Sequence, residues 1–121
     1  MIAIDMEHDD YCDEVHIRAV DTAKLFGDIK RTIGQVDVKQ NWLWSLEVRS
    51  DKRKQGIGER IVAKAMEYIS KRKYPYAFLY CREDVREWYE KRGWVCVDET
   101  TYGHRGKEWI MMKQAKRARE S

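Results

Sequence analysis

The chain has 121 residues, 43% hydrophobic and 12% aromatic, a size and composition that predict one domain spanning residues 1–121. Charged residues make up 37% of it, yet the formal net charge is only +3, which is too weak by itself to indicate nucleic-acid binding. No apolar run reaches membrane-spanning length, the three cysteines form no close pair, and the three histidines show no metal-ligand spacing. We therefore expect a cytoplasmic protein without membrane segment, disulfide framework or metal.

The first forty residues predict strands joined by short turns. Alternating apolar and polar residues predict a strand at 14–20, and weaker patterns predict strands at 1–6 and 23–30. A turn at 32–34 and a further alternating strand at 35–40 complete the series. These spacings favour antiparallel pairing.

Residues 41–48 predict a fourth strand with two distinct faces. Strict alternation places Trp42, Trp44, Leu46 and Val48 on one face and Leu43, Ser45 and Glu47 on the other. Apolar residues at helical spacing then predict a helix over 57–71, and residues 76–81 predict a buried strand. Such a strand–helix–strand unit predicts a parallel pair with a right-handed crossover.

The last third of the chain predicts a short helix and two strands. The helix begins near Asp84 and ends at Gly93, and the strands cover residues 94–97 and 108–112 around a turn at 102–106. Lys113, Lys116, Arg117 and Arg119 make the tail at 113–121 basic. We expect this tail to be solvated, with nucleic-acid contact as the less favoured use.

The turn between the fourth strand and the long helix has the features of a phosphate-binding site. Residues 52–54 are consecutive basic residues, and the small Gly56 and Gly58 allow a ligand to approach the backbone closely. The helix that begins here directs unpaired N–H groups and the positive end of its dipole at the turn. A tight turn without a ligand is the simpler interpretation, but the combination favours an anion such as a pyrophosphate.

This turn and the downstream helix together resemble the GNAT family of N-acetyltransferases. Arg53, Gly56 and Gly58 match motif A of that family, which is Gln or Arg, two residues, Gly, one residue, then Gly or Ala. Residues 85–94 are similar to the family helix whose tyrosine precedes a Lys-x-Gly-aromatic turn. The resemblance covers residues 42–112. It implies an α/β fold of the acyl-CoA N-acyltransferase type: a mixed, mostly antiparallel sheet with a central parallel pair.

The resemblance also implies the transfer of an acetyl group from acetyl-coenzyme A to an amine. It assigns the pyrophosphate to the turn residues Arg53, Lys54, Gln55, Gly56, Ile57 and Gly58, and the pantetheine arm to the backbone of Leu46 and Val48. Tyr89 matches the tyrosine that protonates the departing thiolate. Arg82 stands where many members have an asparagine that contacts the cofactor. Many members also place a carboxylate early in the fourth strand, where this chain has Trp42 and Trp44. Glu47 is the nearest acid and thus the candidate catalytic base, with a solvated or ion-paired glutamate as the simpler interpretation.

Several alternatives stay open at the level of sequence. A non-catalytic module of this fold that binds coenzyme A or a macromolecule is the runner-up, and a nucleic-acid-binding protein is a third class. The region between the first strands leaves little room for the two helices that the family usually has there. We therefore expect an open acceptor cleft, which suits a protein or other macromolecular acceptor or a site completed by a partner subunit. The tryptophans fit core positions or a homodimer surface, and Trp42 and Trp44 also fit an acceptor pocket.

Overall fold

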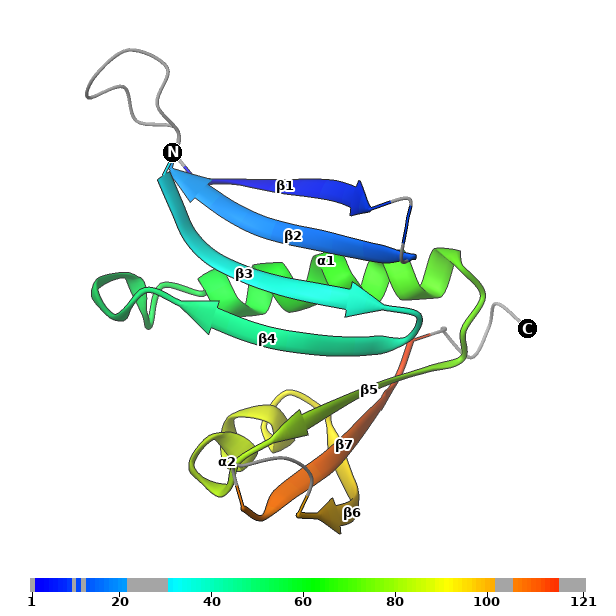
Figure 1. Cartoon of the computed structure of the whole chain (residues 1–121). Helices are drawn as coiled ribbons and strands as arrows, with labels where there is room; N and C mark the ends of the chain where they lie inside the picture. The colour runs from blue at the N-terminus through cyan, green and yellow to red at the C-terminus, as the bar shows by residue number, and fades with distance from the viewer. Residues whose placement is uncertain (1, 10, 12, 22–30, 102–105, 116–121) are drawn as a thin grey trace.

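The structure is a computed structural model that describes residues 2–9, 11, 13–21, 31–101 and 106–115 (Figure 1). Seven strands form one sheet in the order β1-β2-β3-β4-β5-β7-β6. The strands are β1 (Ile2–Asp9), β2 (Glu14–Asp21), β3 (Arg31–Lys39), β4 (Trp42–Val48), β5 (Tyr76–Cys81), β6 (Val95–Thr100) and β7 (Glu108–Gln114). The helices are the 3-10 turn η1 (Ser50–Lys52), α1 (Ile57–Lys71) and α2 (Glu83–Glu90). The predicted mixed sheet with one parallel pair is confirmed, since β4 and β5 pair parallel and all other neighbours antiparallel.

The N-terminal half is an antiparallel run of four strands. The predicted strand at 14–20 is confirmed, and the one at 1–6 extends to Asp9. The predicted strand at 23–30 lies outside the described residues. The turn predicted at 32–34 is wrong, because these residues belong to β3. A Cβ atom on Gly34 would lie 2.8 Å from Ile61 Cδ1, so this glycine allows α1 to pack closely on the strand.

A bulge in β4 overturns the predicted faces of that strand. Ser45 has a φ of 57°, and the pairing of β3 with β4 shifts register between Gln35 and Asp37. The extra residue interrupts the alternation of side chains. As a result Leu43 is buried in the core on the same side as Leu46 and Val48, while Trp42 and Trp44 lie on the other face. Strict alternation had grouped these residues differently.

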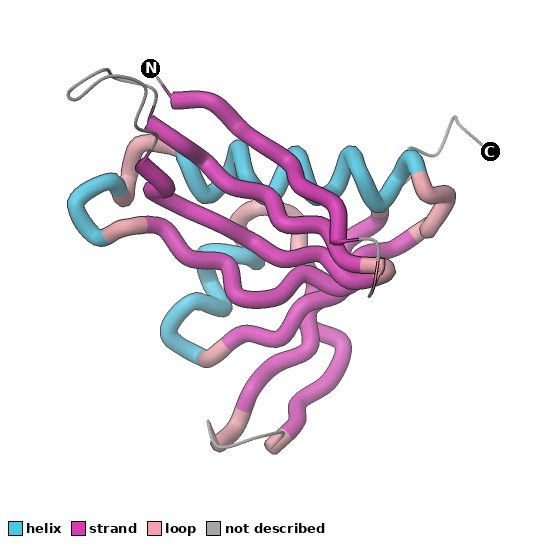
Figure 2. The backbone as a smooth tube through the Cα atoms, turned by 45° about the horizontal axis from the view of Figure 1, so that its top comes forward, coloured by secondary structure: helices cyan, strands magenta, loops and turns pink. Residues whose placement is uncertain are grey.

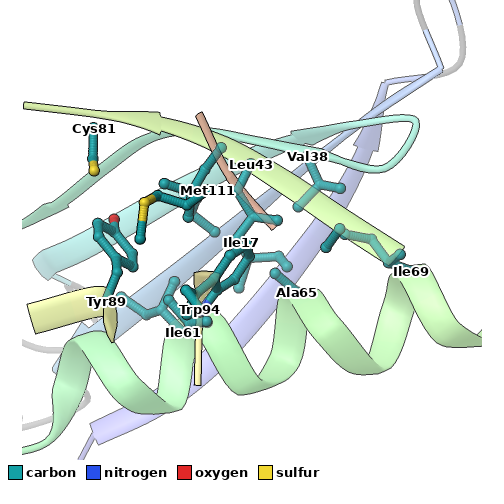
Figure 3. Packing of buried hydrophobic residues seen from close by; sticks show 14 of the residues in the cluster. Ile17, Val38, Leu43, Ile61, Ala65, Ile69, Cys81, Tyr89, Trp94 and Met111 are labelled. Carbon is teal, nitrogen blue, oxygen red and sulfur yellow. The ribbon is translucent and has the colours of Figure 1, made fainter. Parts of the chain in front are cut away.

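Both helices cover the same face of the sheet (Figures 1 and 2). The amphipathic helix α1 buries Ile57, Ile61, Val62, Ala65 and Ile69 against it. Tyr89 of α2 and the following Trp94 join the same cluster, where they lie close to Ile61 (Figure 3). Figure 1 views the sheet from the opposite face, where no helix of the described chain lies over the strands.

The C-terminal predictions are largely confirmed. The buried strand at 76–81 is β5, the short helix is α2, and the two last strands are β6 and β7. The start of the predicted basic tail, Lys113, belongs to strand β7. Residues 116–121 of the tail lie outside the described part. Among the described residues, no helix combines the length and the apolar character that crossing a bilayer requires.

Candidate active site

The basic turn has the backbone geometry of an anion-binding helix start. Gly56 is the N-cap of α1 with a φ of 76°, a left-handed conformation that glycine adopts without strain. No side chain caps this helix end, so its first N–H groups point into the turn without a capping partner. Lys54 and Gln55, just ahead of it, are exposed. The turn predicted from sequence is therefore present and accessible.

Two contacts fix the shape of this turn. The Arg53 Nε donates a hydrogen bond to the backbone O of Val48 over 3.1 Å, which ties the turn to the end of β4. A Cβ atom on Gly58 would lie 3.5 Å from the Trp88 ring and 3.7 Å from Val48 Cγ2. Gly58 therefore sits where the first turn of α1, the end of β4 and helix α2 meet.

The first residues of β4 pair with the middle of β5, and the rest of β4 does not pair with it. The ladder consists of Trp42 opposite Phe78 and Leu43 opposite Leu79, just before the bulge at Ser45. Figure 1 shows the two strands diverging beyond this point. The Arg49 N–H donates to Ile33 O on the β3 side, so alternation turns the backbone groups of Leu46 and Val48 toward β5. These are the residues assigned to the pantetheine arm, and they face the strand with which β4 no longer pairs.

Tyr89 lies on the helix-covered side of this divergence. Its side chain is 7% exposed and makes edge contacts with Trp88 and Trp94 at ring-centroid distances of 5.0 and 5.9 Å. Figure 3 shows its hydroxyl end pointing toward Cys81 of β5. Burial raises the pKa of the Tyr89 phenol above its ordinary value, so the hydroxyl carries its proton at neutral pH. This is the protonation state that a general acid needs.

Cys81 is inert in this setting. Burial, with a smaller contribution from Cys96, raises the pKa of its thiol to about 11. The thiolate is the nucleophilic form of cysteine, and it is scarce at neutral pH under these conditions. The thiol near Tyr89 therefore gives no support to an acyl-cysteine route.

Arg92 holds α2 against the first turn of α1. Its guanidinium stacks over the Trp88 ring at 4.0 Å and donates to Glu59 Oε1 over 2.8 Å. It also donates to the backbone O of Trp88. These contacts position the segment that carries Tyr89 relative to the basic turn at residues 52–58.

Glu47 and Arg82 have fewer packing contacts than Tyr89 and lie at the surface. Glu47 is exposed, and its pairing with Gln35 places it on the open face with Trp44, across the sheet from Tyr89. Arg82 precedes α2 as its N-cap and donates to Asp84 Oδ2 over 3.2 Å. The structure thus gathers the turn, the end of β4 and Tyr89, and leaves Glu47 on the other side of β4.

Sequence reasoning missed two groups on the open face. Trp42 stacks with Phe78 and Tyr80 at 5.1 and 4.9 Å, and Trp44 lies 5.4 Å from Tyr80. Only the two tryptophans were singled out, because the pairing of β4 with β5 was needed to add the others. The second group joins His16 Nδ1 to Asp37 Oδ1 over 2.7 Å, with Glu14 beside them. The alternation phases of residues 14–20 and 35–40 are the signal that could have found this pair.

The site region combines a strand–turn–helix with an uncapped helix start, a diverging parallel pair and a buried tyrosine. The model of the acetyltransferase (GNAT) family matches residues 7–94. The chain therefore belongs to the GNAT acetyltransferase family. Comparison with the sequences of curated proteins found no significant match.

Solved structures share this fold at low sequence identity. An aminoglycoside 6'-N-acetyltransferase complexed with coenzyme A is 20% identical with a TM-score of 0.71, the alignment covering 85% of this chain and 73% of that one. A chain of the NatC complex bound to Gag peptide and CoA is 18% identical with a TM-score of 0.68, and the alignment covers 82% of this chain and 70% of that one. The PaiA N-acetyltransferase from Thermoplasma acidophilum, in complex with coenzyme A, is 22% identical with a TM-score of 0.66. The alignment covers 84% of this chain and 61% of that one. This chain thus spans between 61% and 73% of the length of these three.

Proposed function

We propose that this protein is an N-acetyltransferase that moves an acetyl group from acetyl-coenzyme A to an amine by direct attack. The observation that carries the proposal is the uncapped start of α1 at Gly56, which follows the end of β4, the strand that leaves β5 after Leu43. Family membership and the CoA complexes among the structural neighbours support the choice of ligand.

In this proposal the cofactor follows β4 and ends at the turn. The N–H groups of residues 53–58 bind the pyrophosphate, since they lie at the positive end of the α1 dipole. The backbone of Leu46 and Val48 pairs with the pantetheine arm in place of β5. Because Arg53 already donates to Val48 O, its side chain holds the turn in shape. Arg82, at the start of α2, contributes a further positive charge near the cofactor.

The proposed reaction places acid and base on opposite sides of β4. A neutral amine on the open face attacks the thioester carbonyl carbon, and Glu47 or a water that it orients accepts the amine proton. The C–S bond then breaks as the amide forms, and the departing thiolate takes a proton from the Tyr89 hydroxyl. The protonated state of the buried phenol supports this role.

A non-catalytic CoA-binding module of the same fold is the second candidate. One observation favours it: no helix of the described chain walls the open face on which the acceptor must be held. Binding and transfer measurements separate the two candidates.

The test has two measurements on the full chain. Calorimetric titration with acetyl-coenzyme A should give a one-to-one complex, and no heat at millimolar ligand contradicts both candidates. Incubation with isotopically labelled acetyl-coenzyme A and a panel of amines, read by mass spectrometry, should give labelled amides. Binding without any labelled amide selects the non-catalytic module.

A further inference from the structure

The first residue of β7 is a buried carboxylate. Among the charged residues that the structure describes, only Glu108 is buried, with an exposed fraction of 5%. No described residue forms an ion pair or a hydrogen bond with its carboxylate. Its oxygens are not among the fully enclosed unpaired atoms of the described chain, so part of the carboxylate still reaches solvent. An unpaired carboxylate in such a place costs stability, and a ligand of opposite charge removes that cost.

Strand pairing places Glu108 on the open face. Along β7, Met111 belongs to the hydrophobic core and Trp109 lies under the guanidinium of Arg86 on α2, so these two side chains point to the covered face. The pairing of β5 with β7 has no register shift. Alternation therefore directs Glu108 and Ile110 to the open face.

Glu108 lies beside the opening between β4 and β5. Ile110 pairs with Tyr80, which is the first residue of β5 beyond its ladder with β4. Two residues of a strand span about 7 Å, so Glu108 lies that much further toward the C-terminal end of β5. This end of β5 borders the opening in which the thioester lies in the proposed function.

Tyr89 and Glu108 approach this end of β5 from opposite faces. Figure 3 shows the hydroxyl end of Tyr89 pointing toward Cys81. Burial is the main cause that raises the pKa of the Cys81 thiol to about 11, and the negative charge of Glu108 is a smaller one. Both side chains therefore lie near Cys81, one with a proton to give and one able to take a proton.

An aromatic cluster lies near Glu108 on the open face. Its members are Trp42, Trp44, Phe78 and Tyr80, and each ring touches at least one other. Trp44 is 36% exposed, and its ring lies 5.4 Å from that of Tyr80. Aromatic ring faces attract ammonium groups, and a carboxylate beside them supplies a charged hydrogen-bond acceptor.

We propose that Glu108 binds the acceptor as an ammonium ion and takes its first proton. The inference rests on the proposed function, because it assigns the step that precedes attack at that same site. Alkylamines have a pKa of about 10 and are ammonium ions at neutral pH, whereas attack on the thioester requires the neutral amine. Glu108 suits this step because no described residue competes for its carboxylate.

The protons balance over one turnover. An N–H bond of the ammonium ion breaks as an O–H bond forms on Glu108, which leaves the neutral amine. Attack on the carbonyl carbon releases a second proton to Glu47 or water, and the departing thiolate takes the proton of Tyr89. Glu108 and Glu47 return their protons to solvent, and Tyr89 regains one from it. The sum is one amide, one thiol and one released proton.

The first measurement is amine binding to the full chain saturated with coenzyme A, followed by NMR at about pH 7. The probes are ethylamine, an ammonium ion at this pH, and 2,2,2-trifluoroethylamine, which is neutral. We expect ethylamine to bind about tenfold more tightly, since charge-assisted hydrogen bonds are stronger than neutral ones. Glu108→Gln should abolish this preference. Asp98→Asn should keep it, since Asp98 is an exposed carboxylate on the same face, opposite Ile110.

The second measurement is acetyl transfer to the same two amines. Glu108→Gln should lower kcat/KM by about 100-fold for ethylamine. The loss should be far smaller for trifluoroethylamine, which has no ammonium proton to lose. The melting temperature of this variant should stay unchanged or rise, because the substitution removes a buried charge without a partner.

Each outcome supports or overturns the inference. An ethylamine preference that needs Glu108 supports it, and the same preference without any acetyl transfer contradicts the proposed function alone. No preference in the unchanged protein, a preference kept in Glu108→Gln, or an equal loss in Asp98→Asn overturns it. Equal losses of kcat/KM for both amines, or a lower melting temperature of Glu108→Gln, overturn it in favour of a structural carboxylate. Transfer that Glu108→Gln leaves unchanged assigns the first proton to another group and keeps the proposed function.

Discussion

The two faces of the sheet differ in what covers them. On one face, β2 and β3 direct Val15, Ile17, Val36 and Val38 into a core closed by α1, where each is at most 1% exposed. On the other face, the same strands present His16, Arg18 and Asp37 in polar pairs, and β4 and β5 present the aromatic cluster. The covered face holds the hydrophobic core, whereas no helix of the described chain lies over the open face.

This contrast also separates the proposed roles of the site residues. The basic turn at residues 52–58 and Tyr89 belong to the covered side, where packing fixes them. Glu47 and the aromatic cluster belong to the open side, where contacts depend on what binds. Changes on the covered side should alter stability or the chemical step, and changes on the open side should alter acceptor preference.

The largest expected effect is a difference in stability loss between substitutions at two adjacent residues of β2 whose side chains point to opposite faces. Ile17→Ala removes a side chain that is 0% exposed and should lower the free energy of unfolding by about 3 kcal/mol. Arg18→Ala, whose ion pair with Glu7 is exposed, should cost less than about 1 kcal/mol. Urea denaturation measures both. Similar losses would show that the open face is as closely packed as the covered one.

The second effect concerns the chemical step. Tyr89→Phe removes the hydroxyl while keeping the ring contacts with Trp88 and Trp94, so it should lower kcat by about 100-fold for every acceptor. The affinity for coenzyme A should stay unchanged in calorimetry. Tyr68→Phe is the control, since its hydroxyl only accepts a hydrogen bond from Arg72. An unaltered kcat in Tyr89→Phe would remove this residue from the mechanism.

The third effect separates backbone strain from ligand binding. Gly56 and Gly106 have φ values of 76° and 74°, and a Cβ atom on either would meet no neighbour within 4 Å. Alanine at each should lower the free energy of unfolding by about 1 kcal/mol through strain. Only Gly56→Ala should also weaken coenzyme A binding. Equal affinity of the two variants for coenzyme A would show that the turn at Gly56 takes no part in cofactor binding.

The smallest effect should be a pH dependence on the open face. The hydrogen bond to Asp37 is the main cause that raises the pKa of His16 above 6.5 in the folded protein, and burial opposes it. A raised folded-state pKa stabilises the protein below pH 6.5, and this contribution disappears as the pH rises through the folded-state value. His16→Asn should remove this pH-dependent part of the free energy of unfolding, which amounts to less than about 1 kcal/mol.

Thermal denaturation between pH 5 and 9 measures this slope. The control is His8→Asn, which removes an imidazole that contacts the Tyr68 ring and leaves the His16–Asp37 pair in place. The control should keep the slope of the unchanged protein. A slope that persists in His16→Asn would place its origin elsewhere.

Much of the fold could be predicted because its signals are local. The spacing of apolar residues identified α1, and alternation identified β2. The turn at 32–34 was wrong because Gly34 is required by packing against Ile61, a residue that is distant in sequence. The faces of β4 were wrong because the bulge at Ser45 adds one residue that alternation cannot reveal.

For the candidate site, the sequence by itself determined the basic turn with its two glycines and its attachment to a helix. Gly56, Gly58 and the apolar pattern after them carry that information within a few residues. The tertiary structure alone decided which side chains face one another: the contact of Gly58 with Trp88, the position of Glu47 across the sheet from Tyr89, and the cluster of Trp42 with Phe78 and Tyr80. The physical reason is that such contacts depend on strand pairing and register between distant segments, and register is set by the packing of the whole sheet.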